Sequence, residues 1–171
     1  MSDEYYNSIA EGYNELYEEE QIKKWNFVKS WLNFSNKTVL DVGCGTGIIT
    51  YEIYKLGGKI TGLDSSKKML ALAKNLKSGP NYVLGYAENL PFPDNSFDYV
   101  VSCTMLQDVE DKNKVLHEIN RVCKDYAIVS ILKKEKNAKD IKKLIEKYLK
   151  IIKFAEEEKD FIFLCKPNKK I

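Results

Sequence analysis

Three glycines, Gly43, Gly45 and Gly47, occupy alternate positions between an apolar, β-branched run and an amphipathic stretch. Because glycine has no Cβ, a backbone with this spacing can turn sharply and approach a ligand closely. The first turn of a helix that follows offers free N–H groups and the positive end of the helix dipole. The pattern therefore predicts a ligand-binding loop between a strand and a helix.

The spacing of these glycines also distinguishes between cofactors. The dinucleotide fingerprint Gly-x-Gly-x-x-Gly requires a glycine at position 48, where this chain has Ile48. The spacing therefore argues against a nucleotide-dependent oxidoreductase. Asp64 ends the next predicted strand, where a carboxylate can accept hydrogen bonds from both hydroxyls of a ribose. Together these residues favour a ribose-containing ligand other than a dinucleotide.

The elements that must position these residues alternate along the chain. Strands are predicted at residues 38–42, 59–64, 82–86, 97–103 and 126–132, with helices between them at about 46–56, 66–76, 111–124 and 138–149. Ser65 is predicted to cap the second of these helices, because its hydroxyl can accept an orphan backbone N–H. The alternation predicts a doubly wound α/β fold with a mostly parallel sheet.

The two ends of the chain depart from this alternation. Two amphipathic segments come first, at about residues 2–17 and 20–32, and an antiparallel hairpin of residues 151–154 and 161–164 comes last. The sequence therefore predicts a seven-stranded sheet in one domain, residues 1–171, with a helical cover at 1–34 and a ligand-binding core at 35–171. Ligands of such sheets bind at the carboxyl ends of the strands, where the glycine loop is expected.

The composition sets broad limits on the kind of protein. The 171 residues are 44% hydrophobic and 30% charged, with a net charge of +2, which is typical of a globular protein. No run of apolar residues is long enough to cross a bilayer, so we expect a cytoplasmic protein without a membrane partner. The four cysteines are scattered and there is one histidine, so we expect no metal site and reduced, mostly buried thiols.

The segment from Val39 to Gly47 resembles the first motif of class I S-adenosylmethionine-dependent methyltransferases across all nine residues. The resemblance continues along most of the chain, and it is strongest to the small "type 11" branch related to quinone-biosynthesis methyltransferases. It implies S-adenosylmethionine as the cofactor and S-adenosylhomocysteine as the product. It also implies that Asp64 holds the ribose and that Asp41 fixes the loop or the amino end of the cofactor.

The resemblance extends to a set of cofactor-binding residues. Met69 matches the apolar residue that the family stacks near adenine, although packing in the core explains it equally well. Tyr13 matches a lid over the cofactor, or alternatively an aromatic contact between a helix and the sheet. The complete set implied is Tyr13, Asp41, Gly43, Cys44, Gly45, Gly47, Asp64, Ser65, Met69, Ala87, Glu88 and Cys103.

Two departures from the family pattern bear on the ligand and the acceptor. Tyr86 stands where the family usually has an acidic residue that reaches the adenine amino group. Glu88 or Asn89 could substitute for that residue, and the backbone N–H of Ala87 could still serve the ring. The Asp/Asn-Pro-Pro-Tyr signature is also absent after the fourth strand, where Gln107 and Asp108 stand. Its absence argues against the adenine base and the glutamine side chain as methyl acceptors.

The predicted reaction is an in-line displacement, in which the protein mainly aligns the reactants and excludes water. If a base is needed, Asp108 and Tyr13 are the candidates. The identity of the methyl acceptor stays open among three alternatives. The acceptor is a small molecule held under the N-terminal helices, a protein or RNA bound at an open site, or a substrate whose site a partner subunit completes. A catalytically silent, cofactor-binding partner subunit is a further alternative.

Overall fold

The structure is a computed structural model that describes residues 5, 8, 10–134 and 137–169. A seven-stranded sheet lies at its centre, in the order β3-β2-β1-β4-β5-β7-β6. The strands are β1 (Thr38–Val42), β2 (Lys59–Asp64), β3 (Asn81–Leu84), β4 (Phe97–Cys103), β5 (Cys123–Leu132), β6 (Leu149–Glu156) and β7 (Asp160–Pro167). The first five strands run parallel, and β7 pairs antiparallel with both β5 and β6. The predicted fold class is confirmed.

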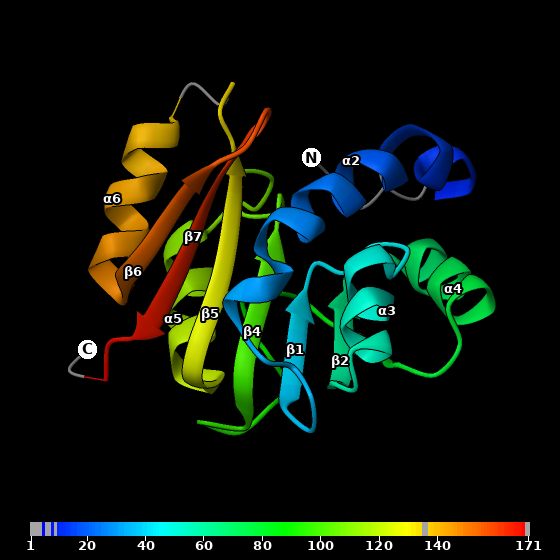
Figure 1. Ribbon diagram of the computed structural model, residues 1–171, viewed down its shortest axis with the longest axis horizontal. Helices are drawn as coiled ribbons and strands as arrows, with labels where there is room; N and C mark the ends of the chain where they lie inside the picture. The colour runs from blue at the N-terminus through cyan, green and yellow to red at the C-terminus, as the bar shows by residue number, and fades with distance from the viewer. Residues whose placement is uncertain (1–4, 6–7, 9, 135–136, 170–171) are drawn as a thin grey trace.

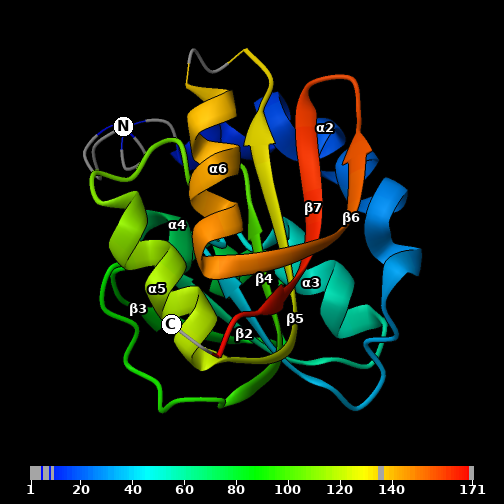
Figure 2. The same ribbon diagram turned by 90° about the vertical axis from the view of Figure 1, so that its left-hand side faces the viewer.

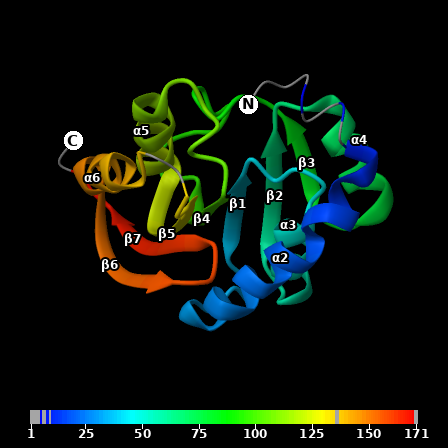
Figure 3. The same cartoon turned by 90° about the horizontal axis from the view of Figure 1, so that it is seen from above.

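Helices cover both faces of the sheet (Figures 1 and 3). One face carries α2 (Tyr13–Val28) and α3 (Ile48–Lys55), with α4 (Lys67–Leu76) packed along β2 and β3. The other face carries α5 (Lys112–Val122) and α6 (Ala138–Tyr148), which stand in front of the strands in Figure 2. Two short 3₁₀ turns, η1 (Ala10–Gly12) and η2 (Lys29–Trp31), flank α2.

Apolar residues at helical spacing explain why the helices pack where they do. Val115 and Ile119 of α5 meet Ile141 and Ile145 of α6 in one buried cluster against the sheet. Trp25 of α2 belongs to a second cluster on the opposite face, together with residues of α3. Full burial of one such side chain stabilises a fold by roughly 1.5–3 kcal/mol. The central strands are mostly apolar and largely buried, because both of their faces are covered.

The predicted elements agree closely with the observed ones, with three corrections. The two predicted N-terminal segments are joined where the structure describes them, because α2 runs without a break through the glutamates between them. Residues 2–4, 6, 7 and 9 of the first segment lie outside the described residues. Ser66, not Ser65, caps α4 and accepts the amide of Met69 at 3.1 Å. The third strand ends at Leu84, because the chain then turns and Tyr86 forms only an isolated bridge with Asn89.

The burial of the cysteines can be compared with the prediction that they are mostly buried. Cys44, Cys123 and Cys165 are buried, as predicted, and Cys103 is half-buried; all four are unpaired thiols. Within the described residues, none of the helices combines the length and the apolar character needed to cross a membrane.

Candidate functional site

The glycine loop connects β1 to α3 through residues that favour left-handed backbone. Gly43, Gly45 and Gly47 have φ angles of +76°, +54° and +76°. A Cβ on Gly43 would lie 2.5 Å from Cγ of Met105, and one on Gly47 would lie 2.5 Å from the hydroxyl of Tyr82. Only glycine fits these two positions without moving the neighbours.

Asp64 joins the glycine loop to the end of β2. Its carboxylate accepts the backbone amide of Gly45 at 2.8 Å and that of Ser66 at 2.9 Å. One carboxylate therefore holds both the loop after β1 and the start of α4. Hydrogen bonds to charged acceptors are stronger than neutral ones, so this contact fixes the shape of the loop.

A cavity of about 380 Å³ opens beside this loop and is called the glycine-loop cavity below. Its lining is Tyr13, Gly43, Gly45, Leu63, Asp64, Ser65, Met69, Gly85, Tyr86, Ala87, Glu88, Cys103, Thr104, Met105, Asp108, Val109 and Glu110. The cavity lies at the carboxyl ends of β1, β2 and β4, as expected for this type of sheet. It brings together most of the residues that the sequence analysis selected.

Three of the selected residues lie behind the loop and outside the cavity lining. The carboxyl of Asp41 accepts the hydroxyl of Thr50 at 2.6 Å, and burial raises its pKa to about 7. Cys44 is buried, and its Sγ faces Gly62. Gly47 packs against Tyr82. These contacts link β1, β2 and α3 beneath the loop, so any effect of these residues on a ligand passes through the loop.

The residues expected at the adenine end occupy one rim of the cavity. Ala87 is buried and Glu88 is half-buried, whereas the side chain of Tyr86 is 60% exposed. Met69 of α4 lines the cavity yet is only 1% exposed, so most of its side chain is covered by neighbouring residues. Both explanations of Met69, core packing and contact with a ligand, are therefore compatible with its place.

A second cavity of about 450 Å³ adjoins the first beneath α2 and is called the α2 cavity below. Its lining is Tyr5, Tyr13, Tyr17, Glu20, Gln21, Thr104, Gln107, Asp108, Leu132, Lys133, Lys134, Glu158 and Lys159. Tyr13, Thr104 and Asp108 line both cavities. These three residues therefore form the boundary between two spaces that meet at the carboxyl ends of the central strands.

Polar contacts hold α2 over both cavities. The hydroxyl of Thr46 in the glycine loop donates to Asn14. Lys159, in the turn between β6 and β7, donates to Glu20. Deeper inside, Lys24 pairs with Asp160. The cover is thus attached to the glycine loop at one end and to the β6–β7 hairpin at the other.

Thr104, directly after β4, has an unusual backbone conformation. Its φ angle is +56°, in the left-handed region that β-branched residues rarely adopt. Such a conformation costs on the order of 1–3 kcal/mol, and it persists only where the surroundings impose it. Sequence reasoning did not select Lys24 or Asp160. Nothing local in the sequence marks them, because their contacts join segments that are far apart in the chain.

The two candidate bases differ in their surroundings. Burial, with Tyr17 and Asp64 nearby, raises the pKa of Tyr13 well above its usual value. Its hydroxyl therefore stays protonated at neutral pH, and Tyr13 does not suit the role of a base. Asp108 is half-buried at the boundary of the two cavities, where a carboxylate can reach a group in either one. Cys103 is an unsuitable nucleophile, since burial raises its thiol pKa to about 12.

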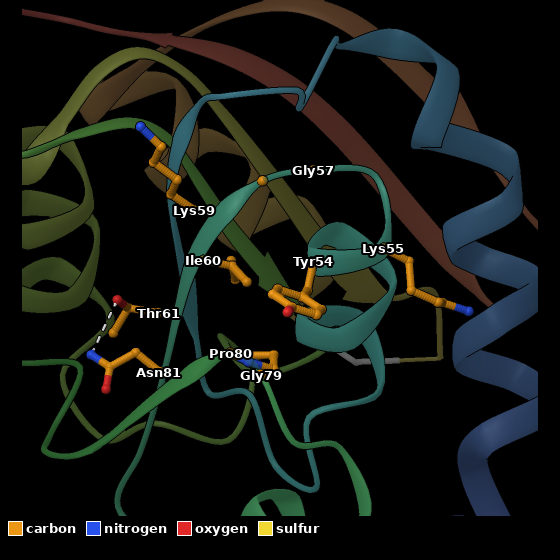
Figure 4. Close-up of a pocket in the computed structure, with 10 residues that line it drawn as sticks. Tyr54, Lys55, Gly57, Lys59, Ile60, Thr61, Gly79, Pro80 and Asn81 are labelled. Atoms are coloured by element: carbon orange, nitrogen blue, oxygen red, sulfur yellow. Dashed lines mark hydrogen bonds between the residues drawn. The ribbon is translucent and has the colours of Figure 1, made fainter.

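Another hollow, of about 750 Å³, lies at the amino ends of β2 and β3 (Figure 4). Tyr54 stands over it, and the side chains of Thr61 and Asn81 meet at its edge at 3.5 Å. It shares no lining residue with the glycine-loop cavity. Because ligands of doubly wound sheets bind at the opposite edge, this hollow plays no part in the site.

Comparison with known proteins agrees with this fold and indicates the family. A family model described as "Methyltransferase domain" matches residues 40–131, more than half of the chain. The demethylmenaquinone methyltransferase of Staphylococcus haemolyticus is 33% identical over 166 residues, covering 88% of this chain and 70% of that protein. The malonyl-[acyl-carrier protein] O-methyltransferase of Buchnera aphidicola is 42% identical over 96 residues, covering 56% of this chain and 39% of that protein. A SAM-dependent methyltransferase from Aquifex aeolicus has a similar fold, with a TM-score of 0.76 and 19% identity, covering 98% of this chain and 100% of that chain.

The doubly wound sheet with an antiparallel β5-β7-β6 end and a glycine loop after β1 is the fold of a Rossmann-like methyltransferase. The chain belongs to the class I S-adenosylmethionine-dependent methyltransferases of the type 11 branch. It spans about half the length of several curated relatives that it matches, for example 46% of the demethylmenaquinone methyltransferase of Thermotoga maritima.

Proposed function

We propose that this protein transfers a methyl group from S-adenosylmethionine to a small-molecule acceptor. The observation that carries the proposal is the junction of the two cavities at Tyr13, Thr104 and Asp108. A methyl donor in the glycine-loop cavity and an acceptor in the α2 cavity would meet at this boundary. Holding two reactants in line in this way supplies much of the rate enhancement of a transfer reaction.

The residues of the glycine-loop cavity fit the methyl donor. Gly43 and Gly45 let the backbone approach the ligand, and Asp64 presents a carboxylate suited to ribose hydroxyls. Ser65, Met69, Ala87 and Glu88 surround the remaining length of the cavity, where the base would lie. When bound, S-adenosylmethionine supplies a methyl group already activated by its sulfonium. Asp41, Cys44 and Gly47 act indirectly in this proposal, by supporting the loop.

The α2 cavity favours the small-molecule alternative among the acceptors. It lies beneath the cover helix, and its walls include the aromatic rings of Tyr5, Tyr13 and Tyr17. The rings of Tyr13 and Tyr17 lie 4.8 Å apart, which gives the cavity an aromatic surface suited to a flat acceptor. One relative named above is described as acting on demethylmenaquinone, which is a small molecule. The other is described as acting on malonyl-[acyl-carrier protein], whose malonyl group is carried on a protein, so it does not bear on this choice.

Asp108 is the proposed proton acceptor where the substrate must lose a proton. It lines both cavities at their boundary, next to the place where the methyl group would be transferred. Tyr13 and the rest of α2 would shield the same place from water. The Asp108→Asn variant should lower the rate of transfer and leave cofactor affinity within about twofold of the wild type.

Two measurements test the proposal. Calorimetric titration should show binding of S-adenosylmethionine and S-adenosylhomocysteine; binding of NAD instead would refute the assigned cofactor. Transfer of a labelled methyl group to fractions of a cell extract should label low-molecular-weight material. Label in protein or RNA would refute the small-molecule acceptor. Cofactor binding without transfer to any fraction would favour a silent partner subunit.

A further inference from the structure

An ion pair between Lys24 of α2 and Asp160, the first residue of β7, is almost completely buried. Nζ of Lys24 lies 2.9 Å from Oδ2 of Asp160, and the two side chains are 1% and 0% exposed. Removing two charges from water is costly, and a buried pair is often no more stable than apolar residues of the same size. Stability alone is therefore a poor explanation for this pair.

Thr104 completes the cluster. Its hydroxyl accepts a hydrogen bond from Nζ of Lys24 and donates one to Oδ1 of Asp160 at 3.1 Å. Its backbone amide donates to Oγ of Ser130 in β5 at 2.9 Å. Three elements, α2, β5 and β7, thus hold one residue, and that residue is in the left-handed conformation.

The segment that follows Thr104 reaches into both cavities. Met105 packs against Gly43 of the glycine loop, and Asp108 belongs to the lining of both cavities. Gln107 donates from Nε2 to the carbonyl of Thr104 at 2.7 Å, so the turn depends on the backbone orientation at 104. In contrast, Lys24 and Asp160 contribute to the lining of neither cavity.

We propose that Lys24 and Asp160 are positioning residues, which hold Thr104 in its left-handed conformation and thereby set residues 104–108 between the methyl donor and the acceptor. The proposal rests on the proposed function, because it concerns the same two cavities. If the pair is lost, the backbone at 104 relaxes, and Met105 moves against the glycine loop. Cofactor affinity should then fall, although neither charged residue lines the cavity.

The first test replaces the pair by apolar residues of similar size, in the double variant Lys24→Met with Asp160→Leu. This variant leaves no unpaired buried charge, so it should fold with a cooperative thermal transition. Calorimetric titration with S-adenosylhomocysteine should show affinity at least about tenfold weaker than the wild type. A purely structural role predicts a shifted melting temperature with unchanged affinity, and that result would overturn the proposal.

The second test removes the need for a restraint at position 104. Glycine adopts a φ of +56° without steric cost, so the pair has nothing left to hold in the Thr104→Gly protein. Adding Lys24→Met with Asp160→Leu to Thr104→Gly should change its affinity for S-adenosylhomocysteine by less than about twofold. A further tenfold loss in this background would show that the pair acts independently of Thr104. Amide exchange of residues 105–109 should rise in the double variant and report the same coupling.

A matched control comes from another buried polar contact. Asn120 is 4% exposed, and its side chain bonds both backbone groups of Asn168 at the opposite end of the sheet. Asn120→Ala should lower the melting temperature and leave affinity for S-adenosylhomocysteine unchanged. If the wild-type protein itself does not bind S-adenosylhomocysteine, the proposed function fails. If the wild type binds and the double variant binds equally well, only the positioning role fails.

Discussion

The carboxylate of Asp64 accepts the backbone amide of Gly45 at 2.8 Å, across the gap between the end of β2 and the glycine loop. An acid at this place therefore does two things at once. It shapes the loop after β1, and it faces the glycine-loop cavity, where a ribose would meet it. The loop and the acid form a single binding feature, although nineteen positions separate them in the chain.

Removal of this carboxylate should weaken ligand binding more than it weakens the fold. We expect Asp64→Ala to lower affinity for S-adenosylhomocysteine by at least about tenfold, because the loop loses its acceptor and the ribose loses its partner. Asp98→Ala is the matched control, since Asp98 accepts the amide and hydroxyl of Thr38 at 3.0 and 3.1 Å at the opposite end of the strands. Both variants should lose about 1–3 kcal/mol of stability. Unchanged affinity in Asp64→Ala, measured by calorimetry, would refute the ribose role.

The glycine loop should not tolerate alanine at Gly43. Its φ of +76° is unfavourable for alanine, and the added Cβ would lie 2.5 Å from Cγ of Met105. We expect Gly43→Ala to lower the free energy of unfolding by about 1–3 kcal/mol and to abolish most binding of S-adenosylhomocysteine. Gly12→Ala is the control, because Gly12 has a φ of −96° and open space around it. Equal thermal melting curves for the two variants would contradict this account.

Asp41 should make stability depend on pH in an unusual direction. Burial raises its pKa from 3.8 to about 7 in the folded protein, so the folded state binds more protons than the unfolded chain between these values. Its contribution to the free energy of unfolding therefore falls as pH rises from about 4 to about 7 and then stays constant. Asp41→Asn keeps an acceptor for Thr50 and removes this dependence. Denaturant unfolding should show that the free energy of unfolding falls less between pH 5 and pH 8 in the variant than in the wild type. An identical fall in both proteins would mean that a group other than Asp41 titrates.

The role of Tyr13 should depend on its ring and not on its hydroxyl. Burial raises the pKa of the hydroxyl, which stays protonated, whereas the ring packs against Tyr17 and over Gly45. We expect Tyr13→Phe to bind S-adenosylhomocysteine within about twofold of the wild type and Tyr13→Ala to bind at least about tenfold more weakly. If Tyr13→Phe instead abolished methyl transfer while retaining affinity, the hydroxyl would have a direct part in the reaction.

Local patterns were enough to predict the core of the fold. Strands β1, β2 and β4 have the bounds expected from their apolar runs, because strand pattern and turn residues are read over a few neighbouring positions. The joining of the two N-terminal segments into α2 was missed. Their charged junction has no apolar periodicity, and contacts with the sheet and the hairpin stabilise the helix there.

The alternation of strands and helices, the glycine loop and the acid at the end of β2 were predictable from the sequence, because each is encoded by residues close together in the chain. The spacing of Gly43, Gly45 and Gly47 was sufficient to predict a sharply turning loop after β1, and a cavity lies beside that loop. The second cavity under α2, and the contact of Lys24 and Asp160 with Thr104 behind its wall, were not predictable in this way and emerge from the folded chain. Lys24, Thr104 and Asp160 come from α2, the end of β4 and the start of β7, and only folding brings them together. Their interaction depends on distance in space, so it leaves no periodic pattern in the sequence.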